Sequence, residues 1–333
     1  MCDVCEVCTH NVVYRAAWTR GGDLTPHRRG RTAARATVCV YRGSSSGEID
    51  DDGSGLRAAR LSCSAPRPDV PSVAWTAAGM QHRAAVYRRA AAEGVALGQR
   101  ERPPSPRAGQ ILARVVCAGV NPVDAKFVVC DKLPGFLQPL ARRLLEGRTP
   151  GLDFSGLVEE APPGSGFAPG DEVYGTAPPF VGSLQELVAV PVHQVAAKPA
   201  SLSFQEAAGL PLVGLTALQA LRDDHGLRAG QRLVVLGASG GVGHVAVQVG
   251  KALGAHVTGV CGAANARFVT ERCGADEVVD YRAAGGDGAG VAAALGERAS
   301  RAGAPFDLVL DCVSSHDPRD AAAGYEAAIR GAR

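Results

Sequence analysis

The chain has 333 residues and a formal net charge of +2 at pH 7. This length suits two domains with a sizeable core, and so small a charge argues against a nucleic-acid partner or a membrane-surface protein. No apolar run approaches the roughly 20 residues of a transmembrane helix, so no membrane span is predicted. The ten cysteines are scattered, several of them inside apolar stretches (Cys117, Cys261, Cys312), which indicates a reducing compartment rather than a disulfide scaffold.

Residues 1–79 differ in composition from the rest of the chain. They are rich in Arg, Ser and Gly and show little periodicity. The arginines between residues 15 and 42 faintly resemble an organelle transit peptide, whereas the acidic start at Asp3 and Glu6 argues against one. We expect a disordered or non-native extension that is not part of the functional fold, in a cytoplasmic protein or, if the extension is a transit peptide, in a plastid or mitochondrion.

Four residues of this segment have the spacing of metal ligands, namely Cys2, Cys5, Cys8 and His10. A structural zinc site needs four ligands on a folded frame. Nothing in the surrounding sequence predicts such a frame, so metal binding is not favoured here.

Residues 80–200 predict a small β domain. Short apolar runs alternate with Pro and Gly turns from Ala84 onward, a pattern typical of short strands joined by tight turns. The expected strands lie at residues 111–119, 157–160, 172–175 and 186–190. Together they predict a small, partly open β-barrel in this part of the chain.

A helical segment is expected over residues 203–221, where the second domain begins. Ser203 is a good N-cap, and Glu206 three residues later completes a capping box.

The segment Leu233–Tyr281 carries the strongest signal in the chain. A four-residue apolar strand, Leu233–Leu236, is followed by a glycine-rich turn over residues 237–243. An amphipathic helix, about Val242–Leu253, and a second strand, His256–Val260, come next. This order predicts a β–α–β unit with its glycines at the first strand-to-helix turn.

Glycines at such a turn allow a tight bend, a close approach of pyrophosphate to the backbone, and close packing of helix on strand. The helix N-terminus then offers N–H groups and a positive dipole end to the phosphates. We therefore predict dinucleotide binding; the alternative is a glycine-rich turn of an ordinary α/β domain. The residues expected at the phosphates are Ala238, Ser239, Gly240, Gly241, Val242 and Gly243.

The end of the second strand indicates which dinucleotide binds. NAD-specific sites usually place Asp or Glu there to hold the ribose 2′-hydroxyl. Cys261 takes that place, and the next carboxylate is Glu271. A 2′-phosphate would meet no repulsion and lies within reach of Asn265 or Arg267, so NADPH is favoured as cofactor. The alternative for Arg267 is a solvent-exposed residue of a first helical turn.

Four ordered blocks resemble one family, and the resemblance covers residues 84–330. They are residues 120–126 (VNPVDAK), 150–156 (PGLDFSG), 169–175 (PGDEVYG) and 237–243 (GASGGVG). Their order and spacing resemble the medium-chain dehydrogenase/reductases, in the zinc-independent quinone oxidoreductase and enoyl reductase branch that includes zeta-crystallin. The resemblance implies an α/β protein, with a GroES-like barrel over residues 80–200 and a Rossmann domain over residues 201–333.

Zinc-dependent members of that superfamily hold a catalytic metal with a Cys in the first block and a His in the second. Asn121 and Leu152 stand at those places, and neither replaces such a ligand well. We therefore expect no metal.

The implied reaction is NADPH-dependent hydride transfer to a quinone or to the activated C=C bond of an α,β-unsaturated carbonyl. The resemblance points to Asn121, Asp124 and Lys126 as site residues. Asn121 would hydrogen-bond the substrate oxygen or the nicotinamide ribose, and Lys126 would stabilise an enolate or donate a proton. Alternatively, Lys126 is an exposed loop cation and Asp124 a carboxylate that caps its own turn.

Two further cofactor contacts follow from the resemblance alone. Thr216 would face the nicotinamide, with hydrogen bonding to its own helix as the alternative. Tyr281 would lie near the adenosine phosphate.

Residues 306–313 predict a later parallel strand, residues 285–290 a loose surface loop, and residues 321–330 a last helix. The family continues with further strands and forms homodimers through them, so we expect a Rossmann domain truncated at its C-terminus and a homodimer only for the full-length domain. The competing functional interpretation is an inactive nucleotide-binding or structural protein of the same fold. Alcohol oxidation would need a metal that the residues do not provide.

Overall fold

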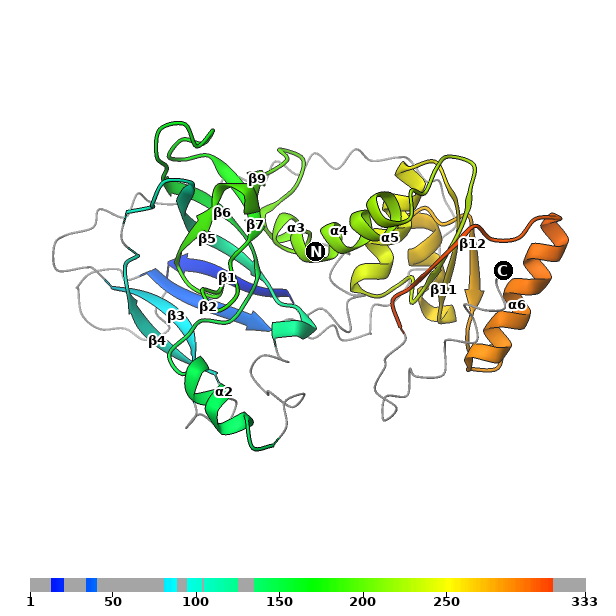
Figure 1. Cartoon of the computed structure of the whole chain (residues 1–333), viewed down its shortest axis with the longest axis horizontal. Helices are drawn as coiled ribbons and strands as arrows, with labels where there is room; N and C mark the ends of the chain where they lie inside the picture. The colour runs from blue at the N-terminus through cyan, green and yellow to red at the C-terminus, as the bar shows by residue number, and fades with distance from the viewer. Residues whose placement is uncertain are drawn as a thin grey trace, which may run out of the picture.

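The computed structural model describes residues 13–20, 34–40, 81–88, 95–103, 105–124 and 135–313. They form a β-rich lobe and an α/β lobe, with the short helices α3 (Phe204–Ala208) and α4 (Pro211–Leu218) between them (Figure 1). Among the described helices, none is long and apolar enough to cross a membrane.

The β-rich lobe is built on one antiparallel sheet of seven strands. Six of them lie in the order β2-β1-β5-β6-β7-β9, and the seventh, β8, pairs with residues 110–114 of β5. The strands at all four predicted ranges are present. The apolar residues of β5 alternate into the core of this lobe, where Ile111, Ala113 and Val115 are almost fully buried. The bounds are β1 (Val13–Arg20), β2 (Ala34–Val40), β5 (Gln110–Gly119), β6 (Asp153–Glu160), β7 (Glu172–Thr176), β8 (Leu187–Pro191) and β9 (Val195–Ala197).

β1 and β2 fall in the segment expected to be an extension. They pair with each other, and Tyr14 of β1 lies opposite Ala118 of β5. Both strands carry β-branched and aromatic residues, which favour a pleated sheet. Whether residues 1–79 belong to the functional fold stays a prediction. The rest of residues 1–79, including the cysteine cluster, lies outside the described residues, and a domain boundary near residue 80 stays a prediction.

A smaller antiparallel pair, β3 (Gln81–Tyr87) and β4 (Val95–Glu101), lies beside the large sheet. Ala84 of β3 bridges to Gln185. Helix α2 (Gln138–Leu145) packs Leu145 against Tyr87 of this pair.

The α/β lobe holds a parallel four-stranded sheet in the order β12-β11-β10-β13. The glycine turn and helix α5 (Gly241–Ala252) follow β10, as the sequence predicts. The strands are β10 (Arg232–Leu236), β11 (His256–Cys261), β12 (Glu277–Asp280) and β13 (Leu308–Asp311).

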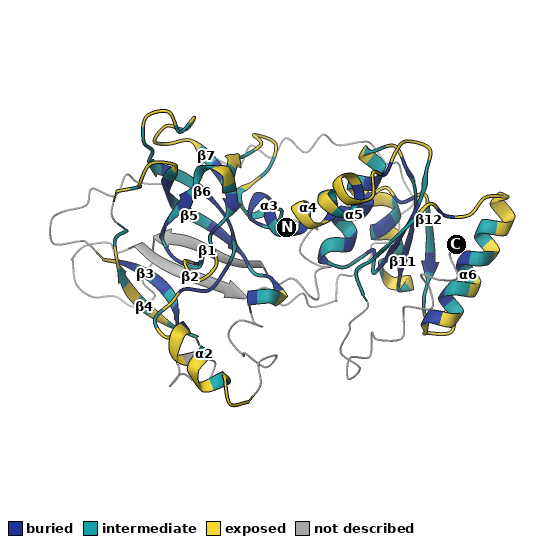
Figure 2. Ribbon diagram, in the orientation of Figure 1, coloured by how far each residue is buried: buried dark blue, intermediate teal, exposed yellow. Residues whose placement is uncertain are grey.

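Both faces of the parallel sheet are covered, which is why its strands are continuous apolar runs. Leu233 and Val235 of β10 face α4 and α5. Val234 and Leu236 face helix α6 (Gly288–Ala302) on the other side. The dark blue, buried strands between partly exposed helices show this arrangement in Figure 2.

Two local expectations need correction. The loop expected over residues 285–290 is shorter, because Asp287 caps the start of α6 by accepting from the N–H of Gly290. The segment expected as one helix over residues 203–221 is two helices with a break at Gly209, followed by a π-helical turn, Gln219–Asp224. The capping box of Ser203 and Glu206 is confirmed, with both reciprocal hydrogen bonds present. The expected helix at 321–330 lies outside the described residues.

Candidate functional site

The glycine turn after β10 packs backbone against backbone. Gly237 has φ +71°, a conformation that favours glycine. A Cβ added to Gly243 would lie 2.0 Å from the carbonyl oxygen of Gly237. Gly240 is the N-cap of α5, and no side chain occupies its capping position. The turn therefore leaves the helix N-terminus open for an anion, which is the arrangement that a pyrophosphate needs.

The other residues predicted at the phosphates lie in the same turn. Ala238 is fully buried and donates its N–H to Val260 in the neighbouring strand, at 2.9 Å. Gly241 and Gly243 are buried in the first turn of α5, and Val242 packs partly against the core. Of this set the Ser239 side chain is the one that makes a polar contact, with Asn265.

Asn265 lies beside the glycine turn although it is 26 positions away in the chain. Its Nδ2 donates to Ser239 Oγ at 3.2 Å. Cys261, at the end of β11, is buried, and burial raises the pKa of its thiol to about 11. The place that carries a carboxylate in NAD-specific sites is therefore neutral here.

Arg267 and Tyr281 both follow this strand end in the chain. The Arg267 side chain is 84% exposed and pairs with Glu271 one helical turn later, at 2.8 Å. This exposed pair is weak enough to exchange for a phosphate. The Tyr281 ring is the nearest group to a Cβ built on Gly262, at 3.5 Å.

Arg282 was missed by the sequence analysis. Its Nε donates to the hydroxyl of Tyr281 at 3.0 Å, and its guanidinium lies 5.4 Å from that ring's centroid. The side chain also approaches Gly262. The available signal was its position next to Tyr281, which the family resemblance places near the adenosine phosphate.

In the β-rich lobe, Asn121 and Asp124 form one tight turn after β5. Asp124 Oδ2 accepts from the N–H of Asn121 at 2.7 Å, and the N–H of Asp124 donates to the Asn121 carbonyl at 3.0 Å. Both residues are about 95% buried. Burial raises the pKa of Asp124, against the effect of the backbone hydrogen bond. The geometry therefore favours the turn-capping interpretation of Asp124. Lys126 lies outside the described residues.

Asp153, at the start of β6, was also missed. Its carboxylate accepts from Asn121 Nδ2 at 3.0 Å and from the N–H of Leu212, in the first turn of α4, at 3.1 and 3.2 Å. The pKa of Asp153 is raised to about 7, mainly by burial. The charge of Asp124 acts in the same direction, and the hydrogen bonds from Asn121 and Leu212 act against both. The sequence signal was the carboxylate next to Leu152, where the family resemblance places the second zinc ligand.

Thr216 lies on α4, the helix that Asp153 holds. Its side chain is exposed, and Oγ1 donates to the Leu212 carbonyl at 2.8 Å. The alternative of a hydrogen bond to its own helix is therefore present, and the hydroxyl oxygen can still accept.

A narrow recess of about 10 Å³, room for about one water molecule, borders this turn. The lining residues are Tyr87, Asp124, Thr149, Pro150, Gly151, Leu152, Pro179 and Phe180.

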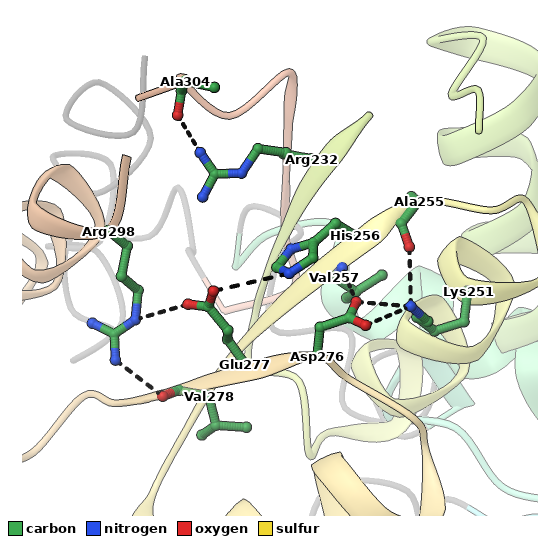
Figure 3. A network of polar contacts seen from close by, with 10 residues as sticks. All are labelled: Arg232, Lys251, Ala255, His256, Val257, Asp276, Glu277, Val278, Arg298 and Ala304. Carbon is green, nitrogen blue, oxygen red and sulfur yellow. Dashed lines mark hydrogen bonds and ion pairs between the residues drawn. The ribbon is translucent and has the colours of Figure 1, made fainter. Parts of the chain in front are cut away.

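A second polar cluster lies at the opposite, amino end of the parallel sheet (Figure 3). Lys251 pairs with Asp276 at 2.7 Å, and Arg298 pairs with Glu277 at 3.3 Å. His256 lies 3.9 Å from the other oxygen of Glu277. In this cluster each carboxylate has a cation partner, and the cluster ties together β11, β12 and the helices beside them.

Comparison with known proteins agrees with this division into lobes. Residues 107–200 match the family model of the alcohol dehydrogenase GroES-like domain, and residues 241–327 match that of the zinc-binding dehydrogenases. The chain belongs to the medium-chain dehydrogenase/reductases, in the quinone oxidoreductase and enoyl reductase branch. The predicted fold, a GroES-like domain followed by a Rossmann-type domain, is confirmed.

Individual relatives show the extent of the match. A mitochondrial NAD(P)H oxidoreductase of Bos taurus, RTN4IP1, is 38% identical over 216 residues, 61% of this chain and 52% of the relative. A chloroplast envelope quinone oxidoreductase homolog of Arabidopsis thaliana is 37% identical over 63% of this chain and 61% of the relative. The chain thus spans about half to three-fifths of the length of these relatives.

Among solved structures, a probable oxidoreductase from Mycobacterium abscessus superposes with a TM-score of 0.58 at 30% identity. The match covers 70% of each chain. Family and fold together support a nicotinamide dinucleotide as the cofactor of this medium-chain dehydrogenase/reductase.

The name of the second family model raises the question of zinc. Leu152 has no donor atom, and Asn121 already donates to Asp153, so this pair does not fit a zinc site. Within the described part of the chain no group of three or more His, Cys, Asp or Glu side chains is arranged to hold a metal ion. A zinc-independent site stays a prediction.

Proposed function

We propose that this protein is an NADPH-dependent oxidoreductase. It would transfer hydride, without zinc, to a quinone or to the activated C=C bond of an α,β-unsaturated carbonyl. The observation that carries the proposal is the Asp153 junction. It joins the loop of Asn121 to the helix of Thr216, and so fastens the barrel loop beside the recess to the lobe that holds the glycine turn.

The residues of the glycine turn fit a dinucleotide, because a Cβ at Gly243 would fill the cradle and the α5 N-terminus has no side-chain cap. When bound, the nicotinamide supplies the hydride. The chain would hold the pyrophosphate with the backbone N–H groups of Ser239, Gly241, Val242 and Gly243, since the N–H of Gly240 donates to the Gly237 carbonyl. Asn265 and Tyr281 would hold the ribose end. Arg267 and Arg282 supply positive charge for a 2′-phosphate.

At the other end, Asn121 and Thr216 would orient the reacting ring. An acceptor whose own oxygen takes up negative charge needs orientation and a proton rather than a Lewis acid. We propose Lys126 as proton donor, because it follows the Asn121–Asp124 turn by two residues.

Thermal unfolding of the full chain with NADPH or NADH tests the first half of the proposal. A ligand that binds only the folded state at a hundredfold excess over Kd adds about 2.7 kcal/mol. We expect a clear rise in Tm with NADPH and a smaller one with NADH. Absence of a rise with either nucleotide contradicts the proposal.

Turnover with a para-quinone and with a 2-alkenal, followed at the absorbance of NADPH, tests the second half. Oxidation of NADPH with either acceptor supports the enzyme. Binding without turnover on any acceptor supports the competing function, a nucleotide-binding protein of the same fold.

We further propose, by analogy with the family, that the protein forms a homodimer when the full-length domain is present, and that it lies in an organelle. The bovine relative is named mitochondrial and the plant relative a chloroplast envelope protein, which favours an organelle over the cytoplasm. Light scattering of the purified chain and imaging of a tagged protein test these two points.

A further inference from the structure

Asp153 is the most buried carboxylate at the junction of the two lobes. Its exposed fraction is 1%. It lies 32 residues after Asn121 and 59 residues before Leu212, yet its two oxygens accept hydrogen bonds from both. One side chain therefore connects strand β6, the loop after β5 and the first turn of α4.

The chemistry of this contact fixes the amide of Asn121. The carboxylate of Asp153 also accepts from the N–H of Leu212. In its ionised form a carboxylate can only accept hydrogen bonds. The Asn121 carboxamide must then turn its Nδ2 toward Asp153, at 3.0 Å. This leaves Oδ1 of Asn121 as an acceptor for a ligand hydroxyl. Without the carboxylate, this hydrogen bond no longer selects between the two orientations of the Asn121 carboxamide, which differ by exchange of Oδ1 and Nδ2.

The same carboxylate holds α4 in place. Thr216 donates to the carbonyl of Leu212, whose N–H donates to Asp153. A substitution at Asp153 should therefore displace both Asn121 and Thr216, the two predicted nicotinamide contacts, although Asp153 itself need not touch the cofactor.

We propose that Asp153 is a positioning residue, which orients the Asn121 carboxamide and couples the barrel loop to helix α4 for cofactor binding. The inference rests on the proposed function for its consequence in catalysis. Its structural part stands independently of that function.

The charge of Asp153 makes this coupling dependent on pH. Burial raises its pKa to about 7, the hydrogen bonds from Asn121 and Leu212 lower it, and the charge of Asp124 raises it. From the described elements packed around it, Asp124 is the one charged group that acts on it. Below about pH 7 the carboxylate takes up a proton, its hold on the two donors weakens, and the orientation of Asn121 is less strongly fixed.

The composition of the chain allows a direct test. It contains three asparagines, Asn11, Asn121 and Asn265, so selective ¹⁵N-asparagine labelling of the full chain gives three side-chain amide signals. The signal lost in Asn121→Ser identifies Asn121. We expect its Nδ2 resonances to shift between pH 6 and pH 8 with a midpoint near 7, and to exchange more slowly with solvent at pH 8.

Two variants separate positioning from packing. Asp153→Asn keeps an oxygen acceptor but has no charge, so the Asn121 signal should show no titration and should stay near its low-pH position. Ser155→Ala is the matched control. Ser155 lies on the same strand, is fully buried, and ties β6 to α3 through the Phe204 carbonyl at 2.5 Å, but it does not contact Asn121. It should leave the titration of Asn121 intact.

Nucleotide binding gives the second readout. For the wild type, we expect the Kd for NADPH to rise several-fold from pH 8 to pH 6. In Asp153→Asn it should be weak and flat over this range, and in Ser155→Ala it should follow the wild type.

The two readouts distinguish the possible failures. An Asn121 signal that does not titrate, or that titrates unchanged in Asp153→Asn, overturns the inference. If Asn121 titrates as expected but NADPH does not bind, the positioning of Asn121 holds and the proposed function fails.

Discussion

Asp153 and Asp276 have similar backbone partners, but their pKa values are shifted in opposite directions. Each accepts a backbone N–H from a neighbouring element, Leu212 for Asp153 and Val257 for Asp276. Burial disfavours the charge of both. For Asp276, the hydrogen bonds and charge of Lys251 and the bond from Val257 outweigh burial and lower its pKa. Asp153 has an amide in place of the cation and a second carboxylate nearby, so its pKa is raised to about 7.

The difference separates a structural carboxylate from one with a functional consequence. At the amino end of the parallel sheet, both carboxylates of the cluster, Asp276 and Glu277, are paired with cations (Figure 3). At the domain junction, the two buried carboxylates Asp124 and Asp153 both have raised pKa values, which is typical of sites that bind or react with a ligand.

The largest expected effect comes from a substitution in the glycine turn, at the carboxyl end of the parallel sheet. In Gly243→Ala the added methyl group would lie 2.0 Å from the Gly237 carbonyl oxygen, so α5 must move away from the turn. We expect a loss of about 3 kcal/mol in the free energy of unfolding and no Tm increase with NADPH. Urea denaturation and thermal unfolding measure the two quantities.

Gly303→Ala is the control. Gly303 caps the C-terminus of α6, at the amino end of the parallel sheet. Gly303 has φ +64°, and a Cβ there meets no atom within 4 Å. The expected loss is about 1 kcal/mol, from the left-handed conformation alone, with NADPH binding retained. Equal losses of NADPH binding in both variants would remove the distinction between the two ends.

The pH dependence of stability is the next largest effect. A raised pKa means that folded Asp153 holds its proton more tightly than the unfolded chain does. Its favourable contribution is present below the unfolded pKa near 4 and is lost as the pH rises through about 7. The stability of Asp153→Asn relative to wild type should therefore increase by about 1 kcal/mol between pH 6 and pH 8.

Asp276→Asn should show the opposite sign. The lowered pKa of Asp276 means that its contribution is present above the unfolded pKa near 4 and is lost as the pH falls through the folded value. The variant should be less stable than wild type by a constant amount from pH 6 to pH 8, and the difference should shrink below pH 4. Denaturant titrations at five pH values compare the two variants; parallel curves for both would contradict the comparison.

A smaller effect is expected at the adenosine end. Arg267→Gln and Arg282→Gln each remove a cation that can reach a 2′-phosphate. Both side chains are exposed, so solvent screens their charge, and each variant should weaken NADPH binding a few-fold and leave NADH binding unchanged. Isothermal titration with both nucleotides measures this. A parallel loss for NADH would indicate structural damage instead.

The smallest effect is expected in the amino-end cluster. Glu277→Gln removes the partner of Arg298 and His256, whose side chains are 27% and 41% exposed. Ion pairs of this exposure contribute up to about 1 kcal/mol. The Tm should fall slightly and the Kd for NADPH should not change. A change in that Kd would show that the cluster communicates with the nucleotide site.

Part of the fold was determined by the sequence because its signals are local. The unit from Leu233 to Cys261 was predicted to within a residue at most ends, since strand, glycine turn and helix each have a short-range pattern. The capping box at Ser203 and the strands from β5 to β8 follow the same logic. In these segments the residues that determine an element lie inside it.

What only the tertiary structure decided depends on contacts between distant residues. Asp153 becomes a junction through partners 32 and 59 positions away, and Asn265 reaches the glycine turn from 26 positions away. The pairing of β1 with β5 likewise joins segments about a hundred residues apart. No periodicity in one sequence encodes which distant donors will surround a carboxylate, because that is set by how the two lobes pack. The sequence determined the family and the nucleotide turn, and the packing of the lobes decided which polar groups meet at the site.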